Sequence, residues 1–451
     1  MTVSRSEGDS PGEPPGDPPG GPPGDSPGGE PPVRPAGGHT LREPCPRCSR
    51  VIEADERFVR WCPACEWNVD PRPQPPPASR FERRAAQAAA DEGPRLLAEV
   101  SLEPEVRLPR DPARLRVWFL ALAVHLVTAA LVGAGVALAV AAWPGVIGVA
   151  VGVVLAFAGL ALGPRPRRGD PGVAAIDLCD ASALAALVGE VAAAVGTAAP
   201  ERFEVDASFG SDLSTTAIRR RTTVRMGAPL WVCLDPQQRV AMLAHVLAHP
   251  VRGDSANRRF VASADESLRR WVDSLTDEAP ARERRGVWGD GLNRAAIAGA
   301  RRIAVAQLRR LRTTATTATQ RAEYRADEIA ARVAGREALT GALETLLLAD
   351  RCTSAARRGA AGGQDPWAAA RRAIADVPGH ERERLRRLSR RRGQAWDDPH
   401  PPTAHRLAFA RTRADLPAQV ACPPERAVAV AAEVHPALAT VAGELQARVG
   451  A

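Results

Sequence analysis

One apolar run constrains this chain more than any other feature. From Val117 to Leu162 there are 46 residues without a charged side chain, with one His125 and a break at Trp143-Pro144-Gly145. Because one bilayer crossing takes roughly 20 apolar residues, the run predicts two membrane helices joined by a tight turn. A single hairpin buried in a soluble core is the alternative interpretation.

Basic residues flank the run on both sides, which fixes the expected orientation. They are Arg110, Arg114 and Arg116 before it and Arg165, Arg167 and Arg168 after it. By the positive-inside rule, both ends of the hairpin lie in the cytoplasm. We therefore expect a multi-pass protein of the inner cell membrane with both termini cytoplasmic and the lipid bilayer as a partner.

The segment before the run divides into three parts. Residues 1–42 are rich in Pro and Gly with almost nothing apolar, so they cannot bury enough surface to offset the entropy of ordering and are predicted to be disordered. Residues 43–70 carry four cysteines. Residues 71–109 read as a Pro-rich linker followed by a polar helix.

The four clustered cysteines predict a structural zinc site. They form two CxxC pairs separated by 13 residues: Cys45, Cys48, Cys62 and Cys65. Two such pairs complete a closed tetrahedral zinc site, which leaves no open coordination position for catalysis. The segment between the pairs alternates in polarity and could supply a small hairpin. The other four cysteines are scattered, which is typical of buried thiols in a reducing compartment.

The region after the hairpin is predicted to be globular and mixed. A helix is expected in ASALAALVGEVAAAV, and strands in RFEVDASF, TTVRMG and APLWVCL. A helix with a clear start follows, in which Asp235 suits the N-cap, Pro236 the first helical position and Gln238 the third. Val240, Leu243 and Leu247 form its expected buried stripe. The chain ends in another helix, within residues 416–451.

Two histidines near the end of this helix point to metal chemistry. His245 and His249 are four residues apart, so their imidazoles emerge one turn apart on one side and can chelate one ion. Such a pair alone is weak support for a metal site. Downstream, Glu323 and Asp327 are also four apart on a predicted helix that ends at Gly335.

The order of these motifs resembles the HtpX-type and CAAX prenyl protease family of membrane zinc metallopeptidases. The matching positions span about residues 200–411 and are His245, His249, Gly253-Asp254, Glu323, Ala326-Asp327, His400-Pro401-Pro402-Thr403 and Arg406. The resemblance implies a gluzincin-like fold in which His245, His249 and Glu323 bind one zinc, while Asp327 orients a ligand imidazole from behind.

The departures from the family pattern concern its chemistry. The glutamate that acts as general base is replaced by Val246, which cannot accept a proton, so no catalytic residue is intact. Ala248 replaces the usual glycine. Pro250 either ends the helix harmlessly or turns His249 away from its ligand position. The stretch before Glu323 has arginines and acids where the family has membrane helices, so soluble or interfacial amphipathic helices are expected.

Three functions of different class are compatible with the sequence. The first is a membrane-anchored peptidase-like protein that has lost catalysis and binds a protein or peptide partner. The second is an active zinc endopeptidase of the protein quality control type, with its base supplied from elsewhere. The third is a membrane-anchored binding protein that acts through the four-cysteine segment, residues 43–70, which resembles a zinc ribbon. Nucleic acid is an unlikely partner, because the formal charge of +8 is spread along the chain and the ribbon has no basic stripe.

The predicted fold is therefore mainly α (α+β). It comprises a gluzincin-like helical domain with a small β-sheet over residues 171–415, a two-helix transmembrane hairpin over 117–162 and a small zinc ribbon. Two zinc ions are expected, one structural and one in the peptidase-like site.

Overall fold

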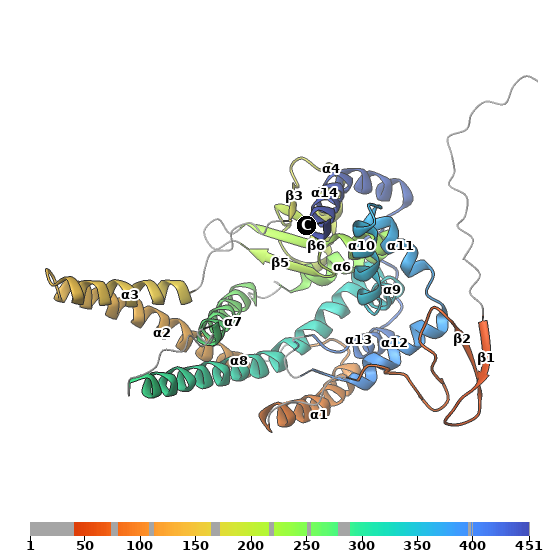
Figure 1. Cartoon of the computed structure of the whole chain (residues 1–451). Helices are drawn as coiled ribbons and strands as arrows, with labels where there is room; N and C mark the ends of the chain where they lie inside the picture. Colours follow the sequence, from red (N-terminus) through yellow and green to blue (C-terminus); the bar gives the residue numbers. More distant parts are fainter. Residues whose placement is uncertain are drawn as a thin grey trace, which may run out of the picture. The chain divides into compact units, whose positions relative to one another are not determined.

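The protein is mainly helical with two small sheets, which confirms the predicted fold class (Figure 1). The computed structural model describes residues 40–73, 80–107, 112–163, 172–215, 221–249, 254–277, 289–395, 398 and 400–450. The predicted disordered tail lies almost wholly outside these residues, as do Pro250, Gly253 and the arginines that follow the apolar run.

The cysteine-rich segment forms a two-stranded module. β1 (Thr40–Pro44) pairs antiparallel with β2 (Val51–Asp55). The hairpin thus encloses the first CxxC pair, whereas the sequence had suggested a hairpin lying between the two pairs. The strand before Cys45 has no apolar alternation of its own and is defined by its partner strand.

Next come one polar helix and two apolar ones. α1 (Arg80–Leu102) is the expected polar helix, and α2 (Pro112–Ala141) and α3 (Val146–Leu162) form a close-packed helical hairpin. Within α2, Leu115–Ala141 is long and apolar enough to cross a membrane, while α3 is a shorter apolar helix. Most large side chains on the outer surface of the hairpin are apolar and exposed.

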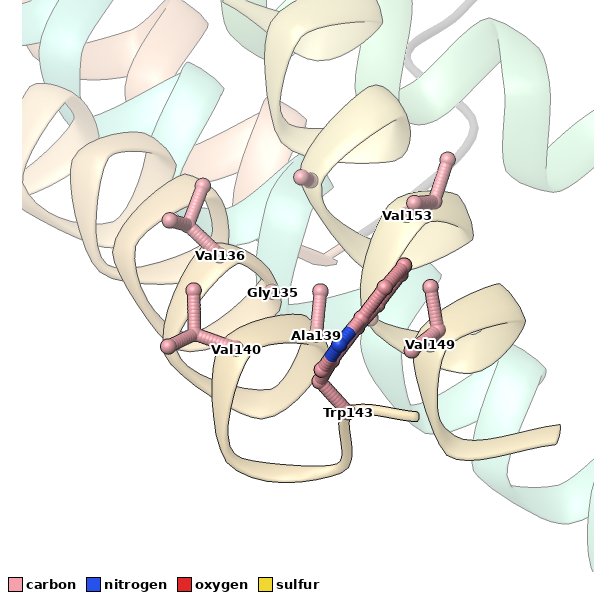
Figure 2. A pocket seen from close by; sticks show the side chains of 9 residues that line it. Gly135, Val136, Ala139, Val140, Trp143, Val149 and Val153 are labelled. Carbon is pink, nitrogen blue, oxygen red and sulfur yellow. The ribbon is translucent and has the colours of Figure 1, made fainter. Parts of the chain in front are cut away.

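The tip of the hairpin is also apolar. Figure 2 shows the indole of Trp143 lying between the two helices, with Ala139 and Val140 on one side and Val149 and Val153 on the other. Gly135 and Gly152 allow the two backbones to approach closely, because a Cβ at either would collide with the facing helix. The hairpin is therefore held together by small residues rather than by polar contacts.

Two helices link the hairpin to the rest of the chain. α7 (Asp254–Asp277) is amphipathic, and α8 (Gly289–Ala334) is one continuous helix of 46 residues. Both pack on α2 through a cluster that includes Val117, Ala121 and Leu268. The expected amphipathic helices in this interval are present.

A four-stranded sheet and its helices form the main core. The sheet has the order β3 (Ala174–Asp177), β4 (Arg202–Asp206), β6 (Thr222–Gly227) and β5 (Ser211–Thr215), with only β4 and β6 parallel. β3 and β5 are short edge strands that the sequence did not reveal. The expected helix is present as α4 (Ser182–Val195).

The predicted strand in APLWVCL is wrong. That segment is a short helix, α5 (Ala228–Cys233), with Pro229 in its first turn and Leu230, Trp231 and Val232 buried. A short apolar run is buried equally well as a strand or as a helix, and the proline at a helix N-terminus decided it.

Five helices surround the core on the C-terminal side. They are α9 (Arg336–Leu346), α10 (Ala349–Ala361), α11 (Pro366–Ala375), α12 (Gly379–Arg392) and α13 (Thr403–Thr412). The last helix, α14 (Pro424–Gly450), satisfies the length and hydropathy test for a membrane span. It nevertheless packs on α4 and α10, with Val430, Val434 and Val441 buried, and it therefore belongs to the core.

Candidate metal centre

The two histidines lie on α6 (Pro236–Ala248), whose start is fixed as the sequence predicted. Asp235 accepts a hydrogen bond from the Gln238 backbone at 2.7 Å, and the Gln238 side chain accepts one from the Asp235 backbone at 3.3 Å, which completes a capping box. Val240, Leu243 and Leu247 are fully buried. This register turns the imidazoles of His245 and His249 toward α8.

The third side chain comes from α8 and completes a convergent set. Glu323 Oε2 lies 3.4 Å from His245 Nε2, and Glu323 Oε1 lies 3.5 Å from His249 Nε2. One donor atom from each of the three residues lies within 4.8 Å of the other two. Helix α6 ends at Ala248, and His249 keeps helical backbone angles. His249 therefore stays on the same face as His245 and next to Glu323, and Pro250 itself is outside the described residues.

The three residues fit a zinc ion. Bonds of about 2.0–2.2 Å in a tetrahedron put two donor atoms about 3.3–3.6 Å apart. Each imidazole has one Glu323 oxygen in this range, Oε2 for His245 at 3.4 Å and Oε1 for His249 at 3.5 Å. Glu323 is 1% exposed, and its Oε2 accepts no hydrogen bond from any described residue. A buried carboxylate oxygen without a donor is costly unless a cation or water serves it. Two imidazoles and one carboxylate are also a common ligand set of open zinc sites.

A buried ion-pair network lies behind the ligands. Asp327, one turn after Glu323 and 0% exposed, lies 2.9 Å from His245 Nδ1. Arg406 on α13 donates two hydrogen bonds to Asp327, at 2.6 and 2.8 Å. The carboxylate therefore holds the proton on Nδ1 and leaves Nε2 of His245 as an acceptor.

The charges of this network shift the pKa values of its members. Burial disfavours the Glu323 carboxylate, but the imidazoles of His249 and His245 outweigh it and hold the pKa of Glu323 well below its usual value. Burial likewise opposes ionisation of Asp327, but Arg406 lowers its pKa. Burial and Arg406 disfavour the imidazolium of His245, yet the adjacent carboxylates of Asp327 and Glu323 raise its pKa.

The side chain of Val246 offers no polar group to this site. It is 1% exposed and belongs to the main hydrophobic core. Since its side chain is hydrocarbon, the residue that follows His245 cannot exchange a proton with anything bound at the centre. Asp254, the nearest downstream acid, has a side chain outside the described part of the chain.

The HPPT segment supplies a further polar pair. His400 Nε2 lies 3.9 Å from Glu323 Oε1, and its Nδ1 lies 3.3 Å from Asp398 Oδ1. Burial would raise the pKa of Asp398, but its bonds to His400 lower it. The His400 side chain is 54% exposed, so it borders the centre from the solvent side. Sequence reasoning did not pair Asp398 with His400.

The four cysteines form a second convergent set. Sγ–Sγ distances are 3.6 Å for Cys45–Cys65 and for Cys48–Cys62. Four zinc–sulfur bonds of about 2.3 Å would give about 3.8 Å, so these thiols fit a zinc ion. Burial raises the pKa of Cys62, but backbone N–H groups of Cys65 and Ala64 outweigh it and lower the pKa to about 6.

The cysteine module is attached to α12. Arg384, which is 5% exposed, donates to the Val69 carbonyl at 2.7 Å, and Arg392 pairs with Asp70 at 2.9 Å. The Arg387 guanidinium lies 5.3 Å from the Trp61 ring centre. The Trp61 side chain is buried.

The comparisons with known proteins agree with this geometry. The model of peptidase family M48 matches residues 180–414, just over half of the chain. The matched region runs from α4 to the end of α13 and includes every residue of the peptidase-like centre. No curated protein and no solved structure matches the chain.

Proposed function

The chain belongs to peptidase family M48, and from that premise we propose that it is a membrane-anchored metallopeptidase-type protein whose own proteolytic activity is impaired. It binds a protein or peptide partner rather than nucleic acid. The observation that carries the proposal is the buried Val246 directly after the first histidine of the centre.

His245, His249 and Glu323 would hold one zinc ion in this proposal. Bound there, zinc would supply a Lewis acid that polarises a carbonyl group and lowers the pKa of water. Asp327 fixes the tautomer of His245, and Arg406 neutralises Asp327. All residues that hold and orient the ion are thus present.

The residue that would move the proton is absent. By resemblance to the family, the side chain at position 246 should take a proton from the attacking water and pass it to the leaving amine. Loss of a general base costs on the order of 100- to 10,000-fold in rate. Because the metal ligands are present and the base is missing, we expect the centre to bind a partner without efficient turnover.

An active endopeptidase is the second candidate, and one observation favours it. His400 borders the centre and is paired with Asp398, an arrangement that can accept a proton. The edge strand β5 contacts α6, and among the described residues no strand pairs with its outer side. An extended peptide could add to that edge next to the centre.

A proteolysis assay with an unfolded protein substrate separates the two candidates. We expect the wild type to be inactive and Val246→Glu to cleave, with His245→Ala inactive in both backgrounds. Cleavage by the wild type that is lost in both His245→Ala and His400→Ala would refute the impaired function and establish the second candidate. Metal content and circular dichroism of each variant check that its centre and fold are intact.

We further propose that α2 and α3 insert into the inner membrane with both ends cytoplasmic. The hydropathy of Leu115–Ala141 and the exposed apolar side chains of both helices support insertion, and the flanking arginines support the orientation. Protease added to inside-out vesicles should digest the peptidase-like region, and protease added to right-side-out vesicles should not. The opposite pattern would refute the orientation.

A further inference from the structure

The near end of the membrane hairpin is enclosed by α7 and α8. Val117, Ala121 and Val124 of α2 pack against Ala264 and Leu268 of α7. Two aromatic side chains extend this contact, because the Trp118 ring stacks on the Phe260 ring with centres 5.6 Å apart. One face of the first turns of α2, which includes Val117 and Ala121, is therefore covered by protein, while Leu115 and Phe119 on another face stay exposed.

A polar contact also joins α2 to α7. His125 Nε2 lies 3.3 Å from the Phe260 carbonyl oxygen and 3.1 Å from Ser263 Oγ. The one histidine of the apolar run thus has its hydrogen-bond partners on α7.

The other membrane helix ends on the same element. Arg270 of α7 donates to the Gly163 carbonyl, and the Trp271 indole donates to the Leu162 carbonyl at 3.3 Å. These bonds satisfy carbonyls left free at the end of α3. A Cβ at Gly163 would lie 3.2 Å from the Thr128 methyl group, so Gly163 and Thr128 stand at the same level of the hairpin.

The length of hairpin beyond this level is short. From Thr128 to Ala141, α2 has 14 residues, which span about 21 Å. The 17 residues of α3 span about 26 Å. The hydrocarbon core of a bilayer is about 30 Å thick, and a tilt would shorten the reach further. Beyond Thr128 and Gly163 both helices are shorter than the hydrocarbon core. If the hairpin crosses the membrane, α7 must therefore lie in contact with the lipid.

The arm formed by α7 and residues 289–311 of α8 has side chains that suit contact with a membrane surface. Its described acids are partly neutralised, since Asp265 pairs with Arg269 and Glu266 with Arg270 within the arm, and Arg312 directly after the arm also pairs with Asp265. Trp118 of α2 and Trp271 of α7 lie where the hairpin meets the arm. Indole side chains are favoured at the interface between membrane and water.

One exposed face of α8 combines cationic and apolar side chains. Arg302, Ile303, Ala306 and Arg310 follow at helical spacing and are all exposed, with Ile303 at 68%. Leu308 and Leu311, which contact the hairpin cluster, lie on the opposite face. An apolar side chain between two arginines suits a phospholipid surface. The apolar side chain can enter the acyl boundary while the guanidinium groups contact the phosphates.

We propose that this arm lies in the headgroup layer of the bilayer and contacts lipid phosphates through Arg302 and Arg310. The inference rests on the proposed insertion of the hairpin. It makes the peptidase-like region a surface-bound unit, because α8 runs without interruption from the arm to Glu323 and Asp327.

Photo-crosslinking of the full chain tests this placement. Benzoylphenylalanine is introduced singly at Ser274 and Ala306 on the arm, at Val140 near the hairpin tip, and at Ser354 on α10, all of which are exposed. The protein is reconstituted in vesicles of equal parts phosphatidylcholine and phosphatidylglycerol and illuminated. Lipid adducts are then counted by mass. We expect both arm positions to give at least tenfold more adduct than Ser354.

Each outcome bears on a distinct claim. Adducts at Val140 but not at Ser274 or Ala306 would overturn the arm's placement and leave the hairpin inserted. No adduct at Val140 would overturn insertion and the arm together. The double variant Arg302→Glu/Arg310→Glu should lower the adduct yield at Ala306 severalfold, whereas Arg357→Glu/Arg358→Glu on α10 should not. Equal yields in the two would refute phosphate contact by Arg302 and Arg310.

Discussion

The most informative perturbation is the replacement of Asp327 by asparagine. Asp327 is 0% exposed and receives two hydrogen bonds from Arg406, which is itself 5% exposed. The substitution keeps the shape but leaves the Arg406 charge buried without a counter-ion. Removing one partner of a buried ion pair costs about 3–5 kcal/mol. For a unit of this size, each kcal/mol lowers the unfolding midpoint by about 2–4 °C, so Asp327→Asn should lower it by about 6–20 °C.

The same substitution should weaken metal binding. His245 Nδ1 loses the carboxylate that lies 2.9 Å away, so its ring is no longer held in the tautomer that presents Nε2. Loss of such a partner typically costs about 10- to 100-fold in metal affinity. Thermal unfolding of the full chain in detergent gives the stability, and competition with a chromogenic chelator gives the zinc affinity.

Two control variants separate charge from coordination. Asp415→Asn removes a mostly exposed partner of Arg336 and should cost less than about 1 kcal/mol. Asp327→Leu combined with Arg406→Met removes both buried charges and should recover most of the lost stability but none of the zinc affinity. The reasoning is refuted if Asp327→Asn is no more destabilising than Asp415→Asn, or if the double variant binds zinc as the wild type does.

Three further predictions concern other parts of the chain. Cys48→Ser should lower the zinc content from about two ions to about one per chain and expose residues 40–73 to limited proteolysis, whereas Cys179→Ser should change neither. Because the raised pKa of His245 in the metal-free protein lets a proton compete for Nε2, zinc affinity should fall with decreasing pH, starting above the ordinary histidine pKa. A flat affinity between neutral and mildly acidic pH would contradict that shift. Glu433→Gln should cost about 0.5–2 kcal/mol, because Glu433 on α14 accepts from the backbone N–H groups of Ala183 and Leu184 at the start of α4. An unchanged denaturant midpoint would exclude α14 as the cap of α4.

The sequence by itself determined several features that depend on spacing within one element. The CxxC pairs, His245 with His249, and Glu323 with Asp327 are each fixed by local backbone geometry, and the apolar run is fixed by its length. The capping box of α6 was predictable for the same reason. The family motifs then placed two of these pairs in one centre, and the M48 match confirms the family.

The tertiary structure decided what depends on contacts between distant elements. Asp327 meets Arg406 across 79 residues, and His125 meets Ser263 across 138, and no periodicity encodes either pairing. Short segments were also decided by their surroundings, since APLWVCL became a helix and Ser211–Thr215 an edge strand. Burial of Val246 and packing of α14 follow from the same cause. A local sequence pattern predicts which face of an element is apolar, but only the tertiary structure shows which residues that face contacts.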